Sequence, residues 1–566
     1  MITSLVVSLL LQAGLPRVSE VAASFREPPQ ELASHVIWGW EGPMDIETIR
    51  HDMDSIRTKG FRSVIFEAGY RLPYEYLSED WFRAIRTAVL EAKARGLKVW
   101  IIDEGKYPSG FAGGKFTRER PDLRMKALVV KDTVYVDGKP VLQVGWNYRT
   151  GQTRAVNNPT GGKDTRNSQC DYLDPAAIRQ FIDWTHEEYK KAIGDEFGKT
   201  FLGFRGDEPD FSYLPWTDSL DARFLEWKGY DPAPYYATLF DRNPDETARR
   251  FRADYFDVWS RMFADSFFKQ QADWCAENGV SYVTHLNKDH DMPECVRVEG
   301  SFFRDLAQVQ IPGVDAIWNQ IWPGTVNDFP KFASSVSHVY GKQRAFSESF
   351  AAYNTPPTVP IARYCLDYQM VRGINFFEFM FWIAGSRQKN WMTDPAMRDL
   401  VVRTDRLTYL HTQGIPGARI AVLYPTSTLW LGDRSVAPEL AGMATQLLHH
   451  QRDFDWVDED ALAEVLEIKG GALWNRSGQA YGTLIIPSCE ALPKRPGTRW
   501  RNSPAGVARS CSGAGSPPSP TDGPSGMPKP SRHSPRGLSW SPRRNGPLPS
   551  RPPFQCRNSR SRATSL

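Results

Sequence analysis

The sequence predicts a (β/α)8 barrel, the TIM-barrel arrangement, followed by an incomplete α/β domain. Three observations lead to this prediction: eight short apolar runs, amphipathic stretches between them, and a restart of the same pattern after Gly414. Short runs rich in β-branched and aromatic residues are typical of parallel strands that are buried on both faces. Eight such strands alternating with helices favour a barrel over an open doubly wound sheet.

The predicted barrel elements follow one another along the chain. The strands are SHVIWGW (34–40), FRSVIFEAG (61–69), LKVWIIDEG (97–105), KTFLGFRGDEP (199–209), VSYVTHLN (280–287), VDAIWNQ (314–320), QRAFSESF (343–350) and INFFEFMFW (374–382). The first two helices each open with an acid suited to an N-cap and close on Gly60 and Gly96. Further helices are expected around 174–194, 246–278, 327–340, 360–372 and 395–412, whereas the segment between the fifth and sixth strands is poorly helical.

Two long insertions leave the carboxyl ends of predicted strands. Residues 106–170 contain a β-hairpin pattern around Asp137-Gly138, and residues 210–245 are rich in aromatic residues and proline. Barrel enzymes build their active sites at this end of the strands. The insertions are therefore expected to border the site.

The remaining segments complete a four-part organisation. Residues 1–33 hold an apolar run that is too short to cross a bilayer. The run resembles a signal peptide, and the alternative is a helix packed on the first domain. A secreted or periplasmic location is therefore slightly favoured over the cytoplasm. Residues 34–413 form the barrel, and residues 414–493 begin a flavodoxin-like α/β domain. Residues 494–566, with 14 prolines and few aliphatic residues, are expected to be a disordered tail or, in the favoured interpretation, an out-of-frame reading of a GC-rich gene.

Composition excludes several classes of function. The net charge of +3 hides an acidic body, because residues 494–566 contain 14 Lys and Arg but one acid, Asp522. An acidic body gives no nucleic-acid footprint. Seven scattered cysteines indicate neither a zinc site nor a disulfide framework. The content of 19 tryptophans weakly favours sugar binding, since indole faces stack on pyranose rings.

Polar and aromatic side chains gather at the predicted strand ends, where buried strands rarely carry charge without a reason. Acids, amides and indoles converging on one barrel mouth describe a carbohydrate site better than a phosphate or dinucleotide site, and no glycine fingerprint follows a strand. The candidates for substrate binding are Trp38, Trp40, Asp103, Glu104, Asp207, His285, Asn287, Trp318, Asn319, Glu378 and Trp382. About half of the tryptophans are expected to be core residues instead.

Glu208 and Glu348 are the predicted catalytic pair. They follow the fourth and seventh strands, which face each other across a barrel mouth. Glycoside hydrolysis needs two such carboxyl groups, one to protonate the leaving oxygen and one to act as nucleophile or as base for water. The alternatives are a Glu208 salt-bridged to Arg205 and a Glu348 solvated in a loop.

Other charged groups have competing interpretations. Glu67 and Glu378 are equally suited to buried ion pairs. The loop GKYPSGFAGG after Asp103 and Glu104 is suited to approach a ligand closely. A metal site could be formed by His285 and His290 with Asp289 and Asp291. A packed histidine with solvated acidic neighbours is the favoured interpretation, so the metal ligands are unknown.

These motifs resemble glycoside hydrolase family 106, the α-L-rhamnosidase-like enzymes, over residues 34–492. The resemblance lies in HVIWGWEGPMDIETIRHDMDSIRTKGFRSVIFEAG, KVWIIDEGKYPSGFAGGKFTRERPDLRMKAL, GDEP and SESF. It implies inverting hydrolysis of terminal α-L-rhamnosides, with Glu208 as general acid, Glu348 as general base and a calcium ion near the sugar. It also implies a longer protein, so the chain is interpreted as a C-terminally truncated form acting on an oligosaccharide or other glycoside.

Three other interpretations stay open. Asp207-Glu208-Pro209 is one residue from the Asn-Glu-Pro of retaining clan A glycosidases, some of which, β-galactosidase-like, carry a flavodoxin-like domain. A truncated barrel that binds sugar without catalysis is the second. A barrel aldolase or isomerase is the third, but Lys288 and Lys342 are poorly placed for it.

Overall fold

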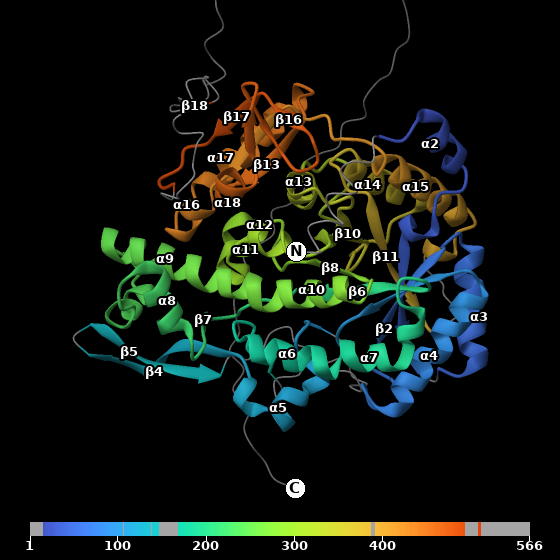
Figure 1. Cartoon of the computed structure of the whole chain (residues 1–566), viewed down its shortest axis with the longest axis horizontal. Helices are drawn as coiled ribbons and strands as arrows, with labels where there is room; N and C mark the ends of the chain where they lie inside the picture. The colour runs from blue at the N-terminus through green and yellow to red at the C-terminus, as the bar shows by residue number, and fades with distance from the viewer. Residues whose placement is uncertain are drawn as a thin grey trace, which may run out of the picture. The chain divides into compact units, whose positions relative to one another are not determined.

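The computed structural model describes residues 15–492, apart from Pro43, Lys106, Asp137, 147–167 and 386–390, together with the backbone of 508–510. Eight parallel strands close into a barrel in the order β1-β11-β10-β9-β8-β6-β3-β2 (Figure 1). They are β1 (His35–Trp40), β2 (Ser63–Ala68), β3 (Lys98–Ile102), β6 (Phe201–Asp207), β8 (Ser281–His285), β9 (Ile311–Ala316), β10 (Phe346–Ser349) and β11 (Phe376–Ile383). The predicted (β/α)8 barrel is confirmed.

Side chains along each barrel strand alternate between the barrel interior and the surrounding helices, as the strand period of two requires. In β1, Ile37 belongs to the interior cluster, which also contains Trp100, Phe346 and Phe376. Its neighbour Trp38 belongs to the larger core under the helices. This alternation decides which strand residues can face the site.

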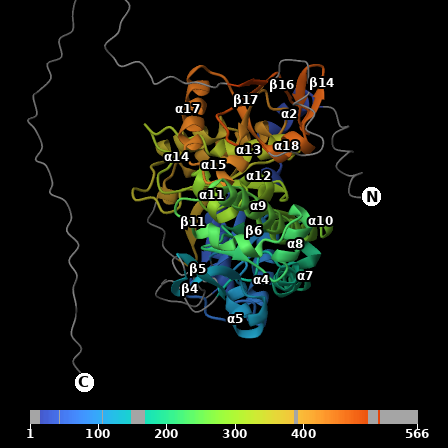
Figure 2. The same cartoon turned by 90° about the vertical axis from the view of Figure 1, so that its left-hand side faces the viewer.

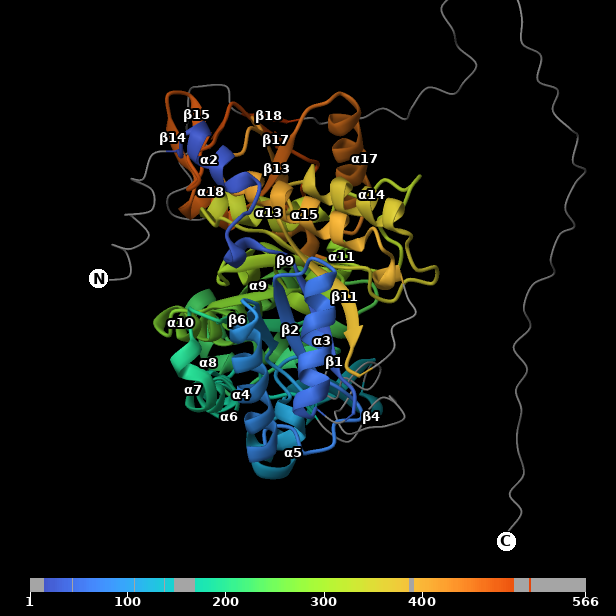
Figure 3. The same cartoon turned by 90° about the vertical axis from the view of Figure 1, so that its right-hand side faces the viewer.

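The helices match the predicted ones closely (Figure 3). They are α3 (Ile46–Thr58), α4 (Glu79–Ala94), α6 (Pro175–Trp184), α7 (His186–Ile193), α9 (Glu246–Phe263), the π-helix η6 (Ala264–Lys269), α10 (Gln270–Glu277), α13 (Pro330–Tyr340), α14 (Val359–Met370) and α15 (Met397–His411). Two short helices, α11 (Met292–Glu299) and α12 (Phe302–Leu306), fill the poorly helical segment between β8 and β9.

The helix caps are partly as predicted. Asp45 accepts a hydrogen bond from the Thr48 N–H at 2.7 Å and caps α3. The cap of α4 is Ser78, whose hydroxyl accepts from Trp81, and not the acid that follows it. A serine hydroxyl and a carboxylate serve the same purpose there, since both accept from the unpaired N–H groups of the first turn.

The two insertions form one small sheet. β4 (Lys126–Val136) and β5 (Lys139–Trp146) make the predicted hairpin, although Asp137 itself lies outside the described residues. β7 (Leu214–Trp216), from the second insertion, adds to the edge of β4 in antiparallel register. Segments after the third and fourth barrel strands are thus joined in one sheet, which lies at the lower left of Figure 1.

The α/β segment that follows belongs to the same compact unit as the barrel. Its parallel sheet has the order β13 (Phe454–Asp458), β12 (Ile420–Tyr424), β17 (Thr483–Ile486) and β18 (Ala508–Ser510), and its helices are α16 (Thr426–Trp430), α17 (Val436–His449) and α18 (Glu459–Glu464) (Figure 2). The Trp430 indole donates to the Gly300 carbonyl at 2.7 Å, and Arg304 pairs with Asp460 at 2.9 Å. These buried polar contacts fix the segment against the barrel.

Two further findings concern the whole described chain. No helix in the described residues is long and apolar enough to cross a membrane. The first 14 residues, on which the signal-peptide prediction rests, lie outside them, as does nearly all of the tail. Residues 15–33 of the N-terminal segment are described, and they include helix α2 (Val18–Phe25) and the 3-10 helix η1 (Gln30–Leu32).

Candidate active site at the barrel mouth

Backbone strain is concentrated in the loops that leave the carboxyl ends of the strands. Glu208, Lys288, Trp318 and Phe350 follow β6, β8, β9 and β10, and all have positive φ although none is glycine. Such conformations persist only where the surrounding structure enforces them, and they cluster at functional sites. The strain therefore marks the end of the barrel where the predicted catalytic pair lies.

Arg205 is a buried cation below this mouth. It points into the barrel from β6 and contacts three carboxylates: Asp207 at 2.8 Å, Glu378 at 3.1 Å and Glu348. Burial alone would lower the pKa of the guanidinium, but these carboxylates raise it well above its usual value, so it stays charged. These three contacts are with acids other than Glu208, whose pairing with Arg205 was the alternative to a catalytic role.

His285 lies between the two predicted catalytic residues. Its Nε2 is 4.0 Å from Glu208 Oε1, 3.9 Å from Glu348 Oε2 and 3.5 Å from Asp207 Oδ1. Burial and the charge of Arg205 lower the pKa of the imidazole well below its usual value, so it is neutral. Both glutamates thus approach one uncharged group.

The shared neighbour limits the separation of the pair. The two carboxylate oxygens of Glu208 and Glu348 can be no farther apart than the sum of their distances to His285, about 8 Å. Carboxyl pairs of retaining glycosidases stand about 5–5.5 Å apart and those of inverting ones about 6.5–9.5 Å apart, so the limit admits the whole first range and the lower part of the second. This limit is compatible with two carboxyl groups that flank one glycosidic bond, and the pairing of Glu208 with Glu348 stays a prediction.

Glu348 and Glu378 lie side by side on β10 and β11 but differ in their electrostatics. Burial raises the pKa of Glu348 well above its usual value; Arg205 opposes the rise, and the charges of Glu378, Asp207 and Glu208 add to it. Burial also acts on Glu378, but Arg205 and a 3.0 Å contact with His35 bring its pKa below the usual value. Glu378 is therefore an ionised, fully buried partner beneath the site.

Asp315 is a site residue that sequence reasoning missed. It lies opposite Glu348 on the neighbouring strand β9, and burial together with the charge of Glu348 raises its pKa well above the usual value. The predicted strand 314–320 began three residues late, because β9 is Ile311–Ala316. With the correct bounds, Asp315 has the same inward position near the strand end as Glu348, and that is the signal that could have identified it.

The glycine-rich loop after β3 is held by Glu104. This carboxylate accepts hydrogen bonds from the backbone N–H groups of Gly105, Phe111, Ala112 and Gly113 at 2.5–2.9 Å. Burial raises the pKa of Glu104 to about 7, and these four donors act against the rise. Glu104 shapes the loop with its own oxygens, an arrangement different from the predicted sugar contact.

Asp103 and the same loop position the backbone beside Glu208. The Ser109 hydroxyl donates to Asp103 Oδ1 at 2.6 Å and accepts from the Asp207 N–H at 2.7 Å. Burial raises the pKa of Asp103 to about 8. Asp103 is fully buried and acts through Ser109, so the loop braces the turn that carries the predicted acid.

Tyr107, also in this loop, donates its phenol hydrogen bond to Glu208 Oε2. No sequence motif identified it. We expect Tyr107→Phe to lower kcat by about ten- to hundredfold with little change in KM, because the carboxyl group loses the contact that orients it. Steady-state kinetics test this, and Tyr76→Phe is the matched control, since Tyr76 donates to the Asp103 backbone and not to Glu208. Equal losses in both variants would contradict a specific role for Tyr107.

The four predicted stacking tryptophans divide between core and surface. Trp38 and Trp40 are fully buried under the helices, with rings 5.4 Å apart, and Trp382 is also buried. All three belong to the core and not to the mouth. On β1 the odd-numbered positions face the interior and the tryptophans occupy the even ones, while Trp382 of β11 is paired with Trp38 after a shift in register. Trp318 is 60% exposed in the loop after β9 and keeps its position as a candidate sugar platform.

The two predicted asparagines and His290 also have defined positions. Asn287 is buried, with its amide donating to Asp210 and its backbone N–H to Glu299. Asn319 accepts from the Asn354 N–H at 3.1 Å and lies beside Trp318. His290 is oriented by Asp289, not by the catalytic pair.

Calcium, which the family resemblance implies, takes six to eight oxygen ligands. The described residues bring together Asp207, His285 and Glu348, and also Glu208, His285 and Asp315. Each group includes an imidazole, and Arg205 occupies carboxylates of the first, so the arrangement does not fit calcium as it stands. The resemblance predicts that a chelator removes activity and that added calcium restores it. For calcium to bind here, either Arg205 must release some of its carboxylates or other residues must supply further ligands.

Comparison with known proteins supports the class that the fold and the carboxylate pair define, a TIM-barrel glycoside hydrolase. The sequence profile of the family described as alpha-L-rhamnosidase matches residues 141–384, which include both predicted catalytic glutamates. A putative beta-glucuronidase from Formosa agariphila is 21% identical over 595 residues, covering 86% of this chain and 49% of its own. The chain thus spans about half the length of this curated relative.

Solved structures confirm the fold. A rhamnosidase from Novosphingobium sp. PP1Y has a TM-score of 0.62 at 16% identity, covering 82% of this chain and 67% of its own. A beta-galactosidase from Rahnella sp. R3 has a TM-score of 0.50 at 11% identity, covering 81% and 68%. These matches are all with glycoside hydrolases or proteins described as such. The family it resembles within that class is glycoside hydrolase family 106, as its motifs predicted.

Proposed function

We propose that the chain is the catalytic part of an inverting α-L-rhamnosidase-like enzyme that removes terminal sugars from a glycoside or oligosaccharide. The observation that carries the proposal is the approach of Glu208 and Glu348 to the same His285 nitrogen from β6 and β10. The match of residues 141–384 to the alpha-L-rhamnosidase family supports the choice of sugar.

The proposed reaction assigns one proton transfer to each glutamate. Glu208 donates its proton to the glycosidic oxygen as the bond from that oxygen to the anomeric carbon breaks. Glu348 takes a proton from water as the water oxygen bonds to the same carbon from the opposite face. Glu208 ends ionised and Glu348 protonated, and exchange with solvent restores both. No step is routed through calcium.

The released anomer tests the stereochemistry. With p-nitrophenyl α-L-rhamnoside as substrate, proton NMR during the first minutes is expected to show β-L-rhamnose before mutarotation. Release of α-L-rhamnose would favour the retaining, β-galactosidase-like alternative for the same two residues. Absence of hydrolysis for α-L-rhamnosides, β-galactosides and β-glucuronides alike would support the non-catalytic barrel.

The acidic limb of the pH profile is expected to depend on Glu378. A general base must be ionised, so activity falls as the pH drops through the raised pKa of Glu348, and the limb should lie above the usual range of a glutamate. Glu378→Gln removes a buried negative charge beside Glu348, so its pKa falls and the limb should move by about one pH unit to lower pH. The measurement is kcat/KM against pH. Glu67→Gln is the control, and an upward shift in Glu378→Gln would contradict the assignment of Glu348 as base.

A further inference from the structure

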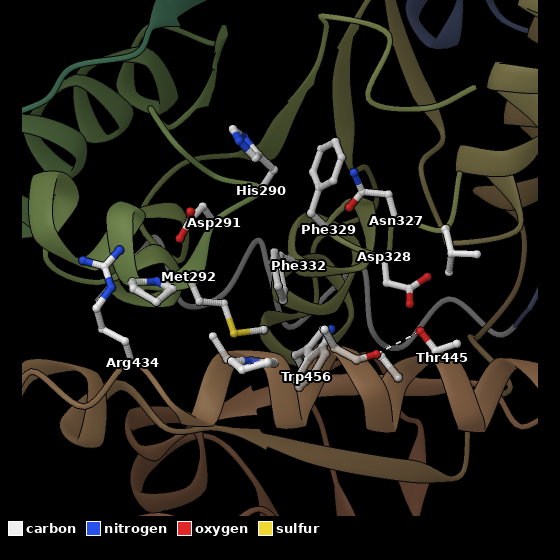
Figure 4. Close-up of a pocket in the computed structure, with 16 residues that line it drawn as sticks. His290, Asp291, Met292, Asn327, Asp328, Phe329, Phe332, Arg434, Thr445 and Trp456 are labelled. Atoms are coloured by element: carbon white, nitrogen blue, oxygen red, sulfur yellow. Dashed lines mark hydrogen bonds between the residues drawn. The ribbon is translucent and has the colours of Figure 1, made fainter. Parts of the chain in front are cut away.

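A cavity of about 420 Å³ lies between the barrel and helix α17, lined by none of the carboxylates of the catalytic cluster (Figure 4). One wall comes from the loops after β8 and β9, and the other comes from α17 with Trp456 of β13. Pockets of roughly 300–1,000 Å³ at the junction of two structural layers are typical of small-molecule sites. The cavity is large enough for one or two sugar units.

The walls of this cleft are formed by firmly packed groups. The rings of Phe332 and Trp456 lie 5.5 Å apart, and both are almost completely buried, so their positions are fixed by the core behind them. From the other side, α17 presents Ala437, Ala441 and Ala444 to the cavity. Because these side chains are short, the space is built into the helix face and does not depend on a mobile side chain.

The charged groups at the edge of the cleft are already paired. Arg434 contacts Glu294 at 2.5 Å, and Arg372 contacts Asp328 at 2.9 Å. Glu294 therefore balances the charge of Arg434, and the carboxylate of Asp291 adds a negative charge to the same lining, which disfavours a phosphate or carboxylate ligand. The cleft is therefore suited to a neutral ligand rather than to an anion.

Hydrogen-bonding groups line one wall, opposite the apolar floor. Figure 4 shows His290, Asp291 and Asn327 on the barrel side, with Met292, Phe332 and Trp456 below them. An imidazole, a carboxylate and an amide together donate to and accept from hydroxyl groups. An apolar floor under such groups matches a pyranose, which has hydroxyls around its edge and a C–H face.

We propose that this cleft is a second carbohydrate-binding site, which takes one neutral pyranose unit outside the catalytic mouth. The choice of a carbohydrate rests on the proposed function, whereas the cavity and its neutral, amphipathic lining do not. The cleft is joined to the mouth: His290 Nδ1 lies 3.8 Å from Asp289 Oδ1, and Asp289 Oδ2 accepts from the Asp315 N–H at 2.6 Å. His290 is therefore linked through Asp289 to the strand end that carries Asp315.

Filling the cleft tests the proposal. Ala441→Trp places an indole in the cavity from the exposed face of α17, and Gln446→Trp adds the same group to that helix outside the cavity lining. Isothermal titration of the full chain with L-rhamnose and with D-galactose, at protein concentrations that resolve millimolar binding, compares both with the wild type. We expect Ala441→Trp to weaken one class of site at least tenfold and Gln446→Trp to leave it unchanged. Ala441→Leu, a milder filling variant, repeats the test if the indole disturbs folding.

The outcomes separate this proposal from the proposed function. The cleft would not be a pyranose site if the Ala441 variants bound each sugar as tightly as Gln446→Trp does. The same conclusion would follow if the wild type bound neither sugar. Hydrolysis of p-nitrophenyl α-L-rhamnoside, which needs one sugar at the mouth, should be unaffected by Ala441→Trp. If no glycoside is hydrolysed but Ala441→Trp still abolishes sugar binding, the cleft stands and the catalytic proposal fails.

Discussion

Glu348→Gln is expected to lower kcat on α-L-rhamnosides by about 10²–10⁴-fold, the usual contribution of a positioned acid or base. Glutamine has nearly the same shape and keeps a hydrogen-bonding group beside Arg205, but it cannot accept a proton from water. The loss should therefore appear in kcat with every leaving group. Steady-state kinetics with a nitrophenyl and an alkyl rhamnoside measure it.

Glu208→Gln is the matched variant, because it removes the other proton transfer. A nitrophenolate departs with little need of protonation, whereas an alkoxide needs a full proton. The loss should therefore be much larger for the alkyl rhamnoside than for the nitrophenyl one. The opposite pattern, with leaving-group dependence in Glu348→Gln, would exchange the two roles and leave the pair itself intact.

The raised pKa of Glu348 makes this comparison informative. Burial and neighbouring charges favour the protonated form in the free protein, while direct contact with Arg205 favours the ionised form that a base requires. The assignment of Glu348 as base follows the family resemblance and the Arg205 contact. The kinetics show whether burial and the neighbouring acids, which favour a protonated Glu348, or Arg205, which favours an ionised one, determine its role.

The sequence was sufficient to predict the barrel and the strand ends that carry Glu208 and Glu348. Strand-length apolar runs are a strong signal, and an acid at the end of such a run has few structural explanations. Asp315 was missed because the predicted strand, 314–320, ended four residues beyond β9 (Ile311–Ala316) and so placed Trp318 and Asn319 near the expected strand end. Boundaries depend on hydrogen bonds between strands, which a single sequence does not contain.

The inward and outward faces of the strands could not be separated from sequence. Buried parallel strands are apolar on both faces, so Trp38 and Trp40 looked as suitable for the mouth as His35 or Ile37. Their true position follows from closure of the barrel. The partners of Arg205 were also unpredictable, since Glu348 and Glu378 are brought to it by strands far along the chain.

Arg205→Met is expected to destabilise the protein by about 3–5 kcal/mol, because it leaves several buried carboxylates without their common cation. Methionine fills much of the same volume, so the loss reports charge rather than a cavity. Asp207, Glu348 and Glu378 would have to take up protons or water to stay buried. Urea unfolding at neutral pH, followed by circular dichroism, measures the change.

Arg205→Lys is the control for this prediction. A lysine keeps the charge but not the planar, multiply donating guanidinium that reaches three carboxylates at once. We expect it to recover part of the stability and little of the activity, since one ammonium cannot hold Glu348 and Glu378 in register. If Arg205→Met unfolds at the same urea concentration as the wild type, the buried acids must already be protonated without Arg205. The cation would then serve to keep Glu348 ionised for catalysis, and its loss would appear in kcat alone.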